Sequence, residues 1–381
     1  MTELDFVIKN GHVVDPSQGI DQVMDIAILD DKIAALPEEY TAVRTIDAEG
    51  CYVTPGLIDC HAHVYRRGSG VCVNPAYMLA PGVTACMDAG SAGSANFEAF
   101  YTDTVIPSQV KIKSYLNMYG SGQADTNIVE KFDIPEYKPK DIRRIVNKYR
   151  HNILGLKIRQ SEGVAVNLEA FDYTVKLAEE LGVGVCVHVS KPLNPIPEIA
   201  NRLRKDDIFC HCYMDVGQDN IFDKDTGKIK ECILEARARG VLFDAANGKM
   251  NFNIKCCQKA LEQGFTPDFI GTDWTKDKYN CSPYAKSLTF VMAKYLQLGM
   301  SLSDVLKCVT ANPARLMGME GQIGTLAPGA CADVAIFKLA DKRVRHLDFD
   351  SNEFFTDKLL VPQMVFSDGE PAFCQADFGL I

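Results

Sequence analysis

The stretch PGLIDCHAH, residues 55–63, decides the fold, because it joins a turn to a short apolar run that ends in two histidines. A run of this length after Pro and Gly is typical of a buried β-strand. Similar runs then alternate with amphipathic stretches of helix length, such as 168–181, which ends at Gly182 as a helix C-terminus should. The predicted strands are 57–61, 83–88, 112–117, 155–159, 184–188, 208–211, 241–244 and 269–273. Eight parallel strands with covering helices predict an α/β fold, a (β/α)8 TIM barrel.

The two ends of the chain have a different pattern. Residues 6–53 contain short β runs separated by turn residues, which predicts a small antiparallel sheet. Turn-and-strand patterning returns from Gly324. We therefore expect a composite β-sandwich domain of residues 1–54 and 321–381, beside a barrel of residues 55–320.

The composition excludes several classes of protein. Of 381 residues, 47% are hydrophobic and 24% are charged, as in folded globular chains. The net charge of -10 argues against nucleic-acid binding, which needs a basic face. The 14 cysteines are scattered, many within apolar runs, and are interpreted as buried, reduced thiols. Neither a secretory signal nor an apolar run of membrane-spanning length is recognised, so we expect a cytoplasmic protein without a membrane partner.

Two histidines lie two residues apart at the end of the first predicted strand. Side chains at i and i+2 point to the same face of a strand, so His61 and His63 can reach one ion. Chance or a core position explains such a pair equally well when it stands alone. However, His188, His211 and Asp273 fall at the ends of three other predicted strands, and these ends meet at one rim of a barrel. Converging imidazoles and a carboxylate are suited to Zn²⁺ and related ions.

Lys157 is unusual because it lies inside an apolar strand, GLKIR at 155–159. Burial disfavours the ammonium form and lowers the pKa of a lysine. A neutral buried amine can react with carbon dioxide to give a carbamate, which is a carboxylate on a long arm that can bridge two metals. The alternative is a side chain that reaches past the strand into solvent, and without the histidines this would be the preferred interpretation.

Together these motifs resemble the amidohydrolase superfamily over nearly the whole chain. Residues 55–63 resemble its first-strand signature, and 310–315 and 323–333 resemble its closing segments. The resemblance implies a binuclear centre of two divalent ions, expected to be zinc, that share a hydroxide. The implied metal ligands are His61, His63, Lys157 as N-carboxylysine, His188, His211 and Asp273. It also implies that Asp273 is catalytic and carries a proton from the attacking water to the leaving group.

Within the superfamily, residues 88–93, 155–159 and 260–273 resemble the deacetylase group, which is related to dihydroorotases and often labelled adenine deaminase. This resemblance implies hydrolysis of an amide or ester bond in a small acylated compound, such as an N-acyl amino acid or an acyl hydroxy acid. The chain departs from close relatives at Ala246-Asn247-Gly248-Lys249, where they carry a Gly-His-Gly. Tyr65 stands where dihydroorotases place an arginine, which counts against dihydroorotate as the substrate.

Contacts to a small-molecule substrate are expected from Arg159, Tyr65, Ser91 and Asn247. Arg159 should point the same way as Lys157 and can pair with a substrate carboxylate, or equally well with a neighbouring acidic residue. Two other functions stay open. One is opening of a cyclic amide, as in dihydroorotases and hydantoinases, and the other is a non-catalytic scaffold, which is expected to lose metal ligands. Homo-oligomers are common among such enzymes, although no residue pattern here indicates one.

Overall fold

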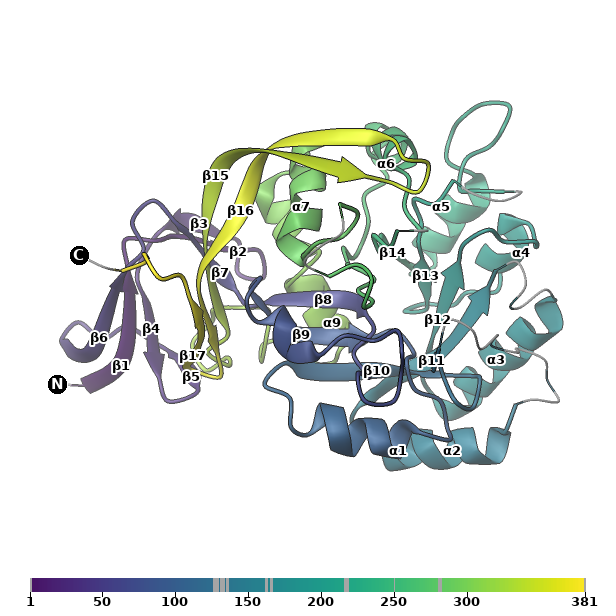
Figure 1. Ribbon diagram of the computed structural model, residues 1–381, viewed down its shortest axis with the longest axis horizontal. Helices are drawn as coiled ribbons and strands as arrows, with labels where there is room; N and C mark the ends of the chain where they lie inside the picture. Colours follow the sequence, from purple (N-terminus) through teal and green to yellow (C-terminus); the bar gives the residue numbers. More distant parts are fainter. Residues whose placement is uncertain are drawn as a thin grey trace.

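A parallel sheet curved into a barrel forms the centre of the computed structural model (Figure 1). The structure describes residues 2–125, 130, 134, 137–161, 164, 167–215, 219–249, 251–279 and 283–379. The barrel strands are β8 (Leu57–Ala62), β9 (Val83–Asp88), β10 (Lys111–Asn117), β11 (Ile153–Gln160), β12 (Gly184–Val189), β13 (Ile208–Cys210) and β14 (Leu242–Asp244). They follow one another in sequence order across a 7-stranded sheet, and every neighbouring pair is parallel. Seven of the predicted barrel strands are therefore confirmed.

The eighth predicted strand, 269–273, is not a regular strand, but it lies between β14 and β8. Phe269 forms a parallel bridge with Asp244, and Trp274 forms one with Ala62. The backbone N–H of Asp273 donates to the carbonyl of His61 at 2.7 Å. Regular pairing ends here because Asp273 has a φ of 49°, which turns the backbone out of the extended conformation. The irregular segment thus connects the two edges of the sheet and brings Asp273 beside β8.

Helices cover the outside of the barrel. The bounds are α1 (Phe97–Phe100), α2 (Pro139–Lys148), α3 (Leu168–Leu181), α4 (Ile196–Ala200), α5 (Glu231–Ala238), α6 (Ile254–Glu262), α7 (Leu288–Gln297), α8 (Leu302–Lys307) and α9 (Ala311–Leu316), with a 3-10 turn at Pro75–Met78 and a π turn at Tyr101–Val105. The predicted helix at 168–181 is confirmed as α3, and it ends at Gly182, whose φ of 64° is left-handed. Among the described residues, no helix has both the length and the apolar character needed to span a membrane.

Two further sheets lie on the side of the molecule that carries both termini, and the six-stranded one combines strands from both ends of the chain (Figure 1). Their strands are β1 (Thr2–Lys9), β2 (His12–Asp15), β3 (Ile20–Val23), β4 (Ile26–Leu29), β5 (Lys32–Ala34), β6 (Tyr40–Asp47), β7 (Tyr52–Pro55), β15 (Val334–Leu347), β16 (Glu353–Ser367) and β17 (Glu370–Cys374). The sheet orders are β5-β4-β1-β6 and β17-β16-β15-β7-β2-β3. Because β1 is antiparallel to β4 but parallel to β6, the prediction of one small antiparallel sheet for residues 6–53 is wrong. Ile8, Val53 and Ile336 belong to a hydrophobic cluster that both sheets share.

Strands β15 and β16 form a hairpin that extends beyond these sheets and lies across α7 (Figure 1). On α7, Phe290 contacts the buried His346 of β15, with 4.0 Å between ring centroids. The tip of the hairpin reaches the N-terminus of α6, where Asp348 Oδ2 accepts a hydrogen bond from Ile254 N at 3.0 Å. Part of the predicted range 321–381 therefore packs on the barrel.

Candidate metal centre

Three of the predicted metal ligands converge at the carboxyl end of β8. His61 Nε2 lies 3.8 Å and His63 Nε2 lies 3.5 Å from Asp273 Oδ1. All three side chains are buried, and one possible ligand atom from each lies within 4.8 Å of the others. This spacing fits a group of ligands around one cation.

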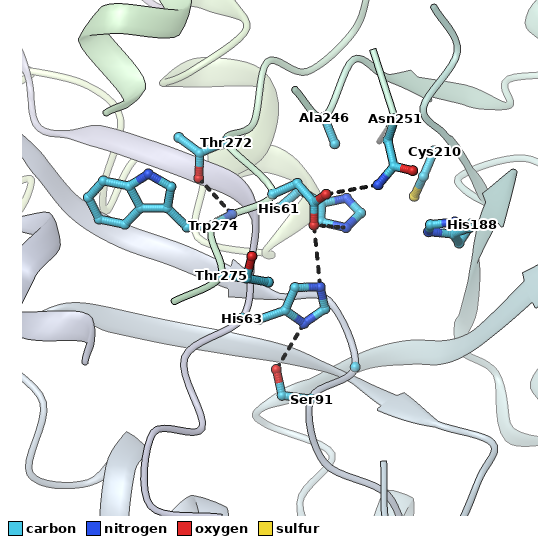
Figure 2. A network of polar contacts seen from close by, with 12 residues as sticks. His61, His63, Ser91, His188, Cys210, Ala246, Asn251, Thr272, Trp274 and Thr275 are labelled. Atoms are coloured by element: carbon cyan, nitrogen blue, oxygen red, sulfur yellow. Dashed lines mark hydrogen bonds and ion pairs between the residues drawn. The ribbon is translucent and has the colours of Figure 1, made fainter. Parts of the chain in front are cut away.

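Hydrogen bonds fix the orientation of both imidazoles on β8. His61 Nδ1 is 2.6 Å from Asp244 Oδ2, and His63 Nδ1 is 3.0 Å from Ser91 Oγ, the contact drawn in Figure 2. The Ser91 hydroxyl donates to Asp88 Oδ2 at 2.7 Å, so it accepts from His63. With Nδ1 acting as the donor in both rings, each Nε2 has a lone pair that faces Asp273.

His188 and His211 face each other at the ends of β12 and β13. His211 Nδ1 donates to the carbonyl of Ala246 at 3.2 Å, so its Nε2 accepts, and this atom lies 2.9 Å from His188 Nδ1. Burial, followed by the charge of neighbouring groups, lowers the pKa of both imidazoles, that of His211 to about 3. Both rings are therefore neutral near pH 7 and can offer lone pairs to a cation.

Lys157 extends from β11 to the same place and is only 3% exposed, so the alternative of a solvent-reaching side chain is wrong. Its Nζ lies 3.3 Å from Cys186 Sγ and 3.7 Å from Cys210 Sγ. Burial lowers the pKa of Lys157, as predicted, but the two thiols and Asp244 outweigh burial and raise it above its ordinary value. The predicted direction of the pKa shift is therefore wrong, because thiols on two other strands reach this amine.

A glycine on the loop after β9 allows Lys157 to take this path. Gly90 has a φ of 91°, and a Cβ there would lie 2.7 Å from Cβ and Cγ of Lys157. Any larger residue would collide with the lysine stem. Among the cysteines that the structure describes, none forms a disulfide, although the Cys186 and Cys210 sulfurs are 3.2 Å apart.

A cavity of about 300 Å³ opens above these side chains. Its lining residues are His61, His63, Ala89, Asn117, Gln123, Glu130, Lys157, Arg159, Ser161, His188, Ser190, Lys191, Asn251, Asp273, Thr275 and Lys278. Five of the six predicted metal ligands line it, and His211 lies directly behind His188. The sequence therefore predicted correctly which residues the fold brings together here.

The carboxylate of Asp273 has two further partners at the cavity wall. Asn251 Nδ2 donates to Asp273 Oδ2 at 2.9 Å, and Lys278 Nζ lies 3.1 Å from the same oxygen. Burial raises the pKa of Asp273, but neighbouring groups, above all the charge of Lys278, outweigh burial and hold the pKa well below its usual range. Asp273 is therefore ionised, and an ionised carboxylate can bind a cation or accept a proton.

Of the predicted substrate contacts, only Arg159 lines the cavity. Its Nη1 donates to Glu130 Oε2 at 2.5 Å, so Arg159 pairs with a neighbouring acid. The structure places Tyr65 in the core, 5.0 Å from the Phe100 ring. Ser91 orients His63, as described above. Tyr65 and Ser91 thus lie away from the cavity, and so does Asn247.

Asn247 is buried behind the cavity, in the loop after β14. Its Nδ2 donates to Tyr295 Oη at 2.9 Å and to the carbonyl of Ala245, and its Oδ1 lies 3.4 Å from Lys294 Nζ. Lys294 is itself buried and donates to the carbonyl of Tyr284 at 2.7 Å. Asn247 therefore belongs to a polar network outside the residues that line the cavity.

Sequence reasoning missed several residues around the centre. Asp244 had a usable signal, because an acid at the end of a barrel strand faces the same rim as the histidines. Asn251 and Lys278 lie on loops, and Glu130 lies 29 residues before its partner Arg159. Neither strand periodicity nor spacing marks such positions.

Comparison with known proteins gives consistent matches over most of the chain. The model of the Amidohydrolase family matches residues 52–372. A deacetylase of Agrobacterium fabrum is 30% identical over 344 residues, which are 88% of this chain and 83% of the relative. A deacetylase of Brucella anthropi is 29% identical and covers 88% and 84% of the two chains.

Solved structures resemble the whole chain. A crystal structure of a dihydroorotase has a TM-score of 0.82 and 26% identity, and the match covers 99% of both chains. A crystal structure of an adenine deaminase has a TM-score of 0.85 and 24% identity, with 98% of this chain and 100% of that chain covered. At 24% identity the second likeness supports the fold alone.

Proposed function

Because this chain belongs to the amidohydrolase family and is a metal-dependent hydrolase of that family, we propose that it cleaves an amide or ester bond in a small acylated compound, such as an N-acyl amino acid or an acyl hydroxy acid. The expected superfamily membership is confirmed by the match over residues 52–372. The observation that carries the proposal is the convergence of histidines and a carboxylate on one cavity that also contains a buried lysine.

The donor set fits a binuclear centre of divalent ions, which we propose to be zinc. His61, His63 and Asp273 would hold one ion, His188 and His211 the other, and carboxylated Lys157 both. The fit rests on the ring orientations, since Nδ1 donates to a protein acceptor in the rings of His61, His63 and His211, so the lone pair that would bind a cation lies on Nε2. When bound, such ions lower the pKa of water and polarise a scissile carbonyl.

Carboxylation of Lys157 requires the neutral amine, whereas the nearby thiols and Asp244 favour ammonium. We therefore expect the carbamate to persist only while the cations are bound. Their attraction for the carbamate offsets the free-energy cost of deprotonating the amine. Carboxylation of Lys157 and cation binding are thus coupled. Carbon dioxide is part of the proposed cofactor set for this reason.

Asp273 is the proposed proton carrier. Its ionised carboxylate accepts a proton from the attacking water, and Asn251 and Lys278 hold Oδ2 in place while this happens. Asp273 then delivers the proton to the departing nitrogen or oxygen. The same side chain thus acts first as a general base and then as a general acid.

Opening of a cyclic amide is the second candidate function. The similarity to a dihydroorotase structure, at 26% identity over 99% of both chains, favours it. The deacetylase relatives cover 88% of this chain at up to 30% identity and favour the acyl compound. A non-catalytic scaffold is disfavoured, because every implied metal ligand is present.

The organisation of the chain is proposed on the same basis. Residues 1–54 and 321–381 form a composite β-sandwich domain, which the shared hydrophobic cluster supports, and residues 55–320 form the barrel. The free cysteines support a location in the reducing cytoplasm.

The test combines metal analysis with a substrate screen. Purified protein supplemented with zinc or manganese is analysed for metal and assayed with N-acyl amino acids, acyl hydroxy acids and cyclic amides. About two ions per chain and cleavage of acyl compounds are expected. Cleavage of cyclic amides alone would make the second candidate the function, and absence of metal after supplementation would leave the scaffold.

A further inference from the structure

Besides Lys157, three cationic side chains line the cavity, and two of them already have acidic partners. Arg159 pairs with the buried Glu130 at 2.5 Å, and Lys278 pairs with Asp273 at 3.1 Å. In the part of the chain that the structure describes, Lys191 has no carboxylate within 4.0 Å of its Nζ. Among the described residues, Lys191 is therefore the cavity-lining cation that no carboxylate neutralises.

The backbone of Lys191 is held in a conformation that lysine rarely adopts. Its φ is 49°, in the left-handed region. His211 and Asp273, both in the candidate metal centre, are left-handed as well, with φ of 63° and 49°. The other described non-glycine residues with positive φ have short polar side chains: Asn10, Asp30, Asp206, Ser351 and Asp368. Strain of this kind persists where the surrounding structure fixes a functional side chain.

The β15–β16 hairpin supports the ammonium group of Lys191. Lys191 Nζ lies 5.4 Å from the centroid of the Phe349 ring, at the tip of the hairpin. Phe349 is itself fixed, because its backbone N–H donates to the carbonyl of Phe252 at 3.2 Å. The aromatic face attracts the cation without neutralising its charge. A residue at the far end of the sequence thus helps to set a charge at the cavity.

We propose that Lys191 binds the anionic group of the substrate, a carboxylate in the acylated compounds named above, and that Phe349 positions its ammonium group. This proposal rests on the proposed function, because the reacting bond and the carboxylate must occupy the same cavity. It gives Lys191 the role that the sequence suggested for Arg159, whose charge Glu130 already matches. Lys191 then determines specificity, and Phe349 acts through it.

The decisive measurement is binding, which does not depend on turnover. N-acetylglycine and N-acetylglycinamide differ in the carboxylate and are achiral, so stereochemical preference does not enter. Calorimetric titration of the zinc-loaded full chain is expected to give about tenfold tighter binding of the carboxylate, the effect of one charge-assisted hydrogen bond. Equal binding of the two compounds, or no binding of N-acetylglycine, would overturn the proposal.

Variants identify the side chain responsible. Lys191→Asn removes the charge but tolerates the left-handed backbone, and it should abolish the preference while leaving zinc content and carboxamide binding unchanged. Lys191→Arg should keep the preference, and Phe349→Leu should reduce it by roughly threefold. Lys342→Asn removes an exposed lysine of the hairpin and serves as the matched control. A preference that survives Lys191→Asn would assign anion binding to another group and refute the proposal.

Hydrolysis assays on the same two compounds separate this proposal from the proposed function. Binding with a Lys191-dependent preference, but without hydrolysis of any acyl compound, would refute the function and uphold the anion site. Hydrolysis of an acyl compound, together with a preference for the carboxylate that Lys191→Asn does not change, would uphold the function and refute the anion site.

Discussion

The two halves of the candidate metal centre are held in different ways. In the β8 half, His61 and His63 each have an Nδ1 partner inside the protein, Asp244 at 2.6 Å and Ser91 at 3.0 Å. In the β11–β13 half, Lys157 contacts thiols, and His188 and His211 contact each other at 2.9 Å. Oriented rings lose little freedom when they bind an ion, whereas the second half must exchange contacts between its own ligands for contacts to the ion. The difference indicates that the β8 half is preorganised and that the other half is completed on binding.

The largest effect is expected at Asp273, the proposed proton carrier. Asp273→Asn should lower kcat/KM by about 10²–10⁴-fold, because the amide cannot accept the proton from water. Folding and most metal binding should persist, which elemental analysis and a thermal melt would check. Turnover near the original rate would contradict the proton-carrier role.

Lys157→Ala should remove at least one of the two ions, because the shared carbamate is lost with the amine. Addition of a short carboxylic acid should restore the missing ion in part. Metal content by elemental analysis, with and without the acid, is the measurement. Lys294→Met, which removes a buried lysine outside the centre, is the matched control and should bind as many metal ions as the original chain. Full metal content in Lys157→Ala would exclude a carbamate ligand.

The preorganised half is tested through the partners of its rings. Asp244→Asn should weaken zinc binding by about 10–100-fold, the usual effect of losing a partner of a metal-bound histidine. Ser91→Ala should weaken it less, because His63 loses a neutral acceptor rather than a charged one. Zinc affinities from competition with a chelator give the order. A larger loss in Ser91→Ala would show that charge does not set the orientation of this half.

The smallest effect concerns Lys294, which lies outside both halves. Burial lowers its pKa to about 7 from an ordinary value of 10.5. Between pH 7 and 10.5 the unfolded chain binds more protons at this group, so its contribution makes the free energy of unfolding rise with pH, by at most about 1.4 kcal/mol per unit. Urea unfolding of metal-free protein at pH 7.5 and 9 should show this rise in the original chain relative to Lys294→Met. Parallel pH dependence of the two proteins would contradict a lowered pKa.

Sequence reasoning predicted which side chains converge at the cavity, because their positions follow from strand ends in a barrel. His61, His188 and Asp273 required only the rule that parallel strands bring their carboxyl ends to one rim. The same rule could not foresee that Asp273 leaves the extended conformation, since a φ of 49° depends on contacts with β8. The eighth strand was therefore expected to be regular and is not.

Properties that depend on contacts between distant segments were harder to predict from the sequence. The pKa of Lys157 was predicted in the wrong direction, because Cys186 and Cys210 approach from neighbouring strands. The pairing of Arg159 with Glu130 was one of two open alternatives, and sequence spacing did not favour either. Phe349 carries no motif, and only the long hairpin brings it to Lys191.

The reach of the β15–β16 hairpin has a consequence for the order in which the molecule is completed during translation. The ribosome has made every proposed metal ligand once residue 273 is joined, but Asp348 and Phe349 follow 75 or more residues later. A nascent chain that already carries the ligands still lacks the acceptor for Ile254 N and the ring beside Lys191. The rim of the cavity is therefore finished among the last steps of synthesis.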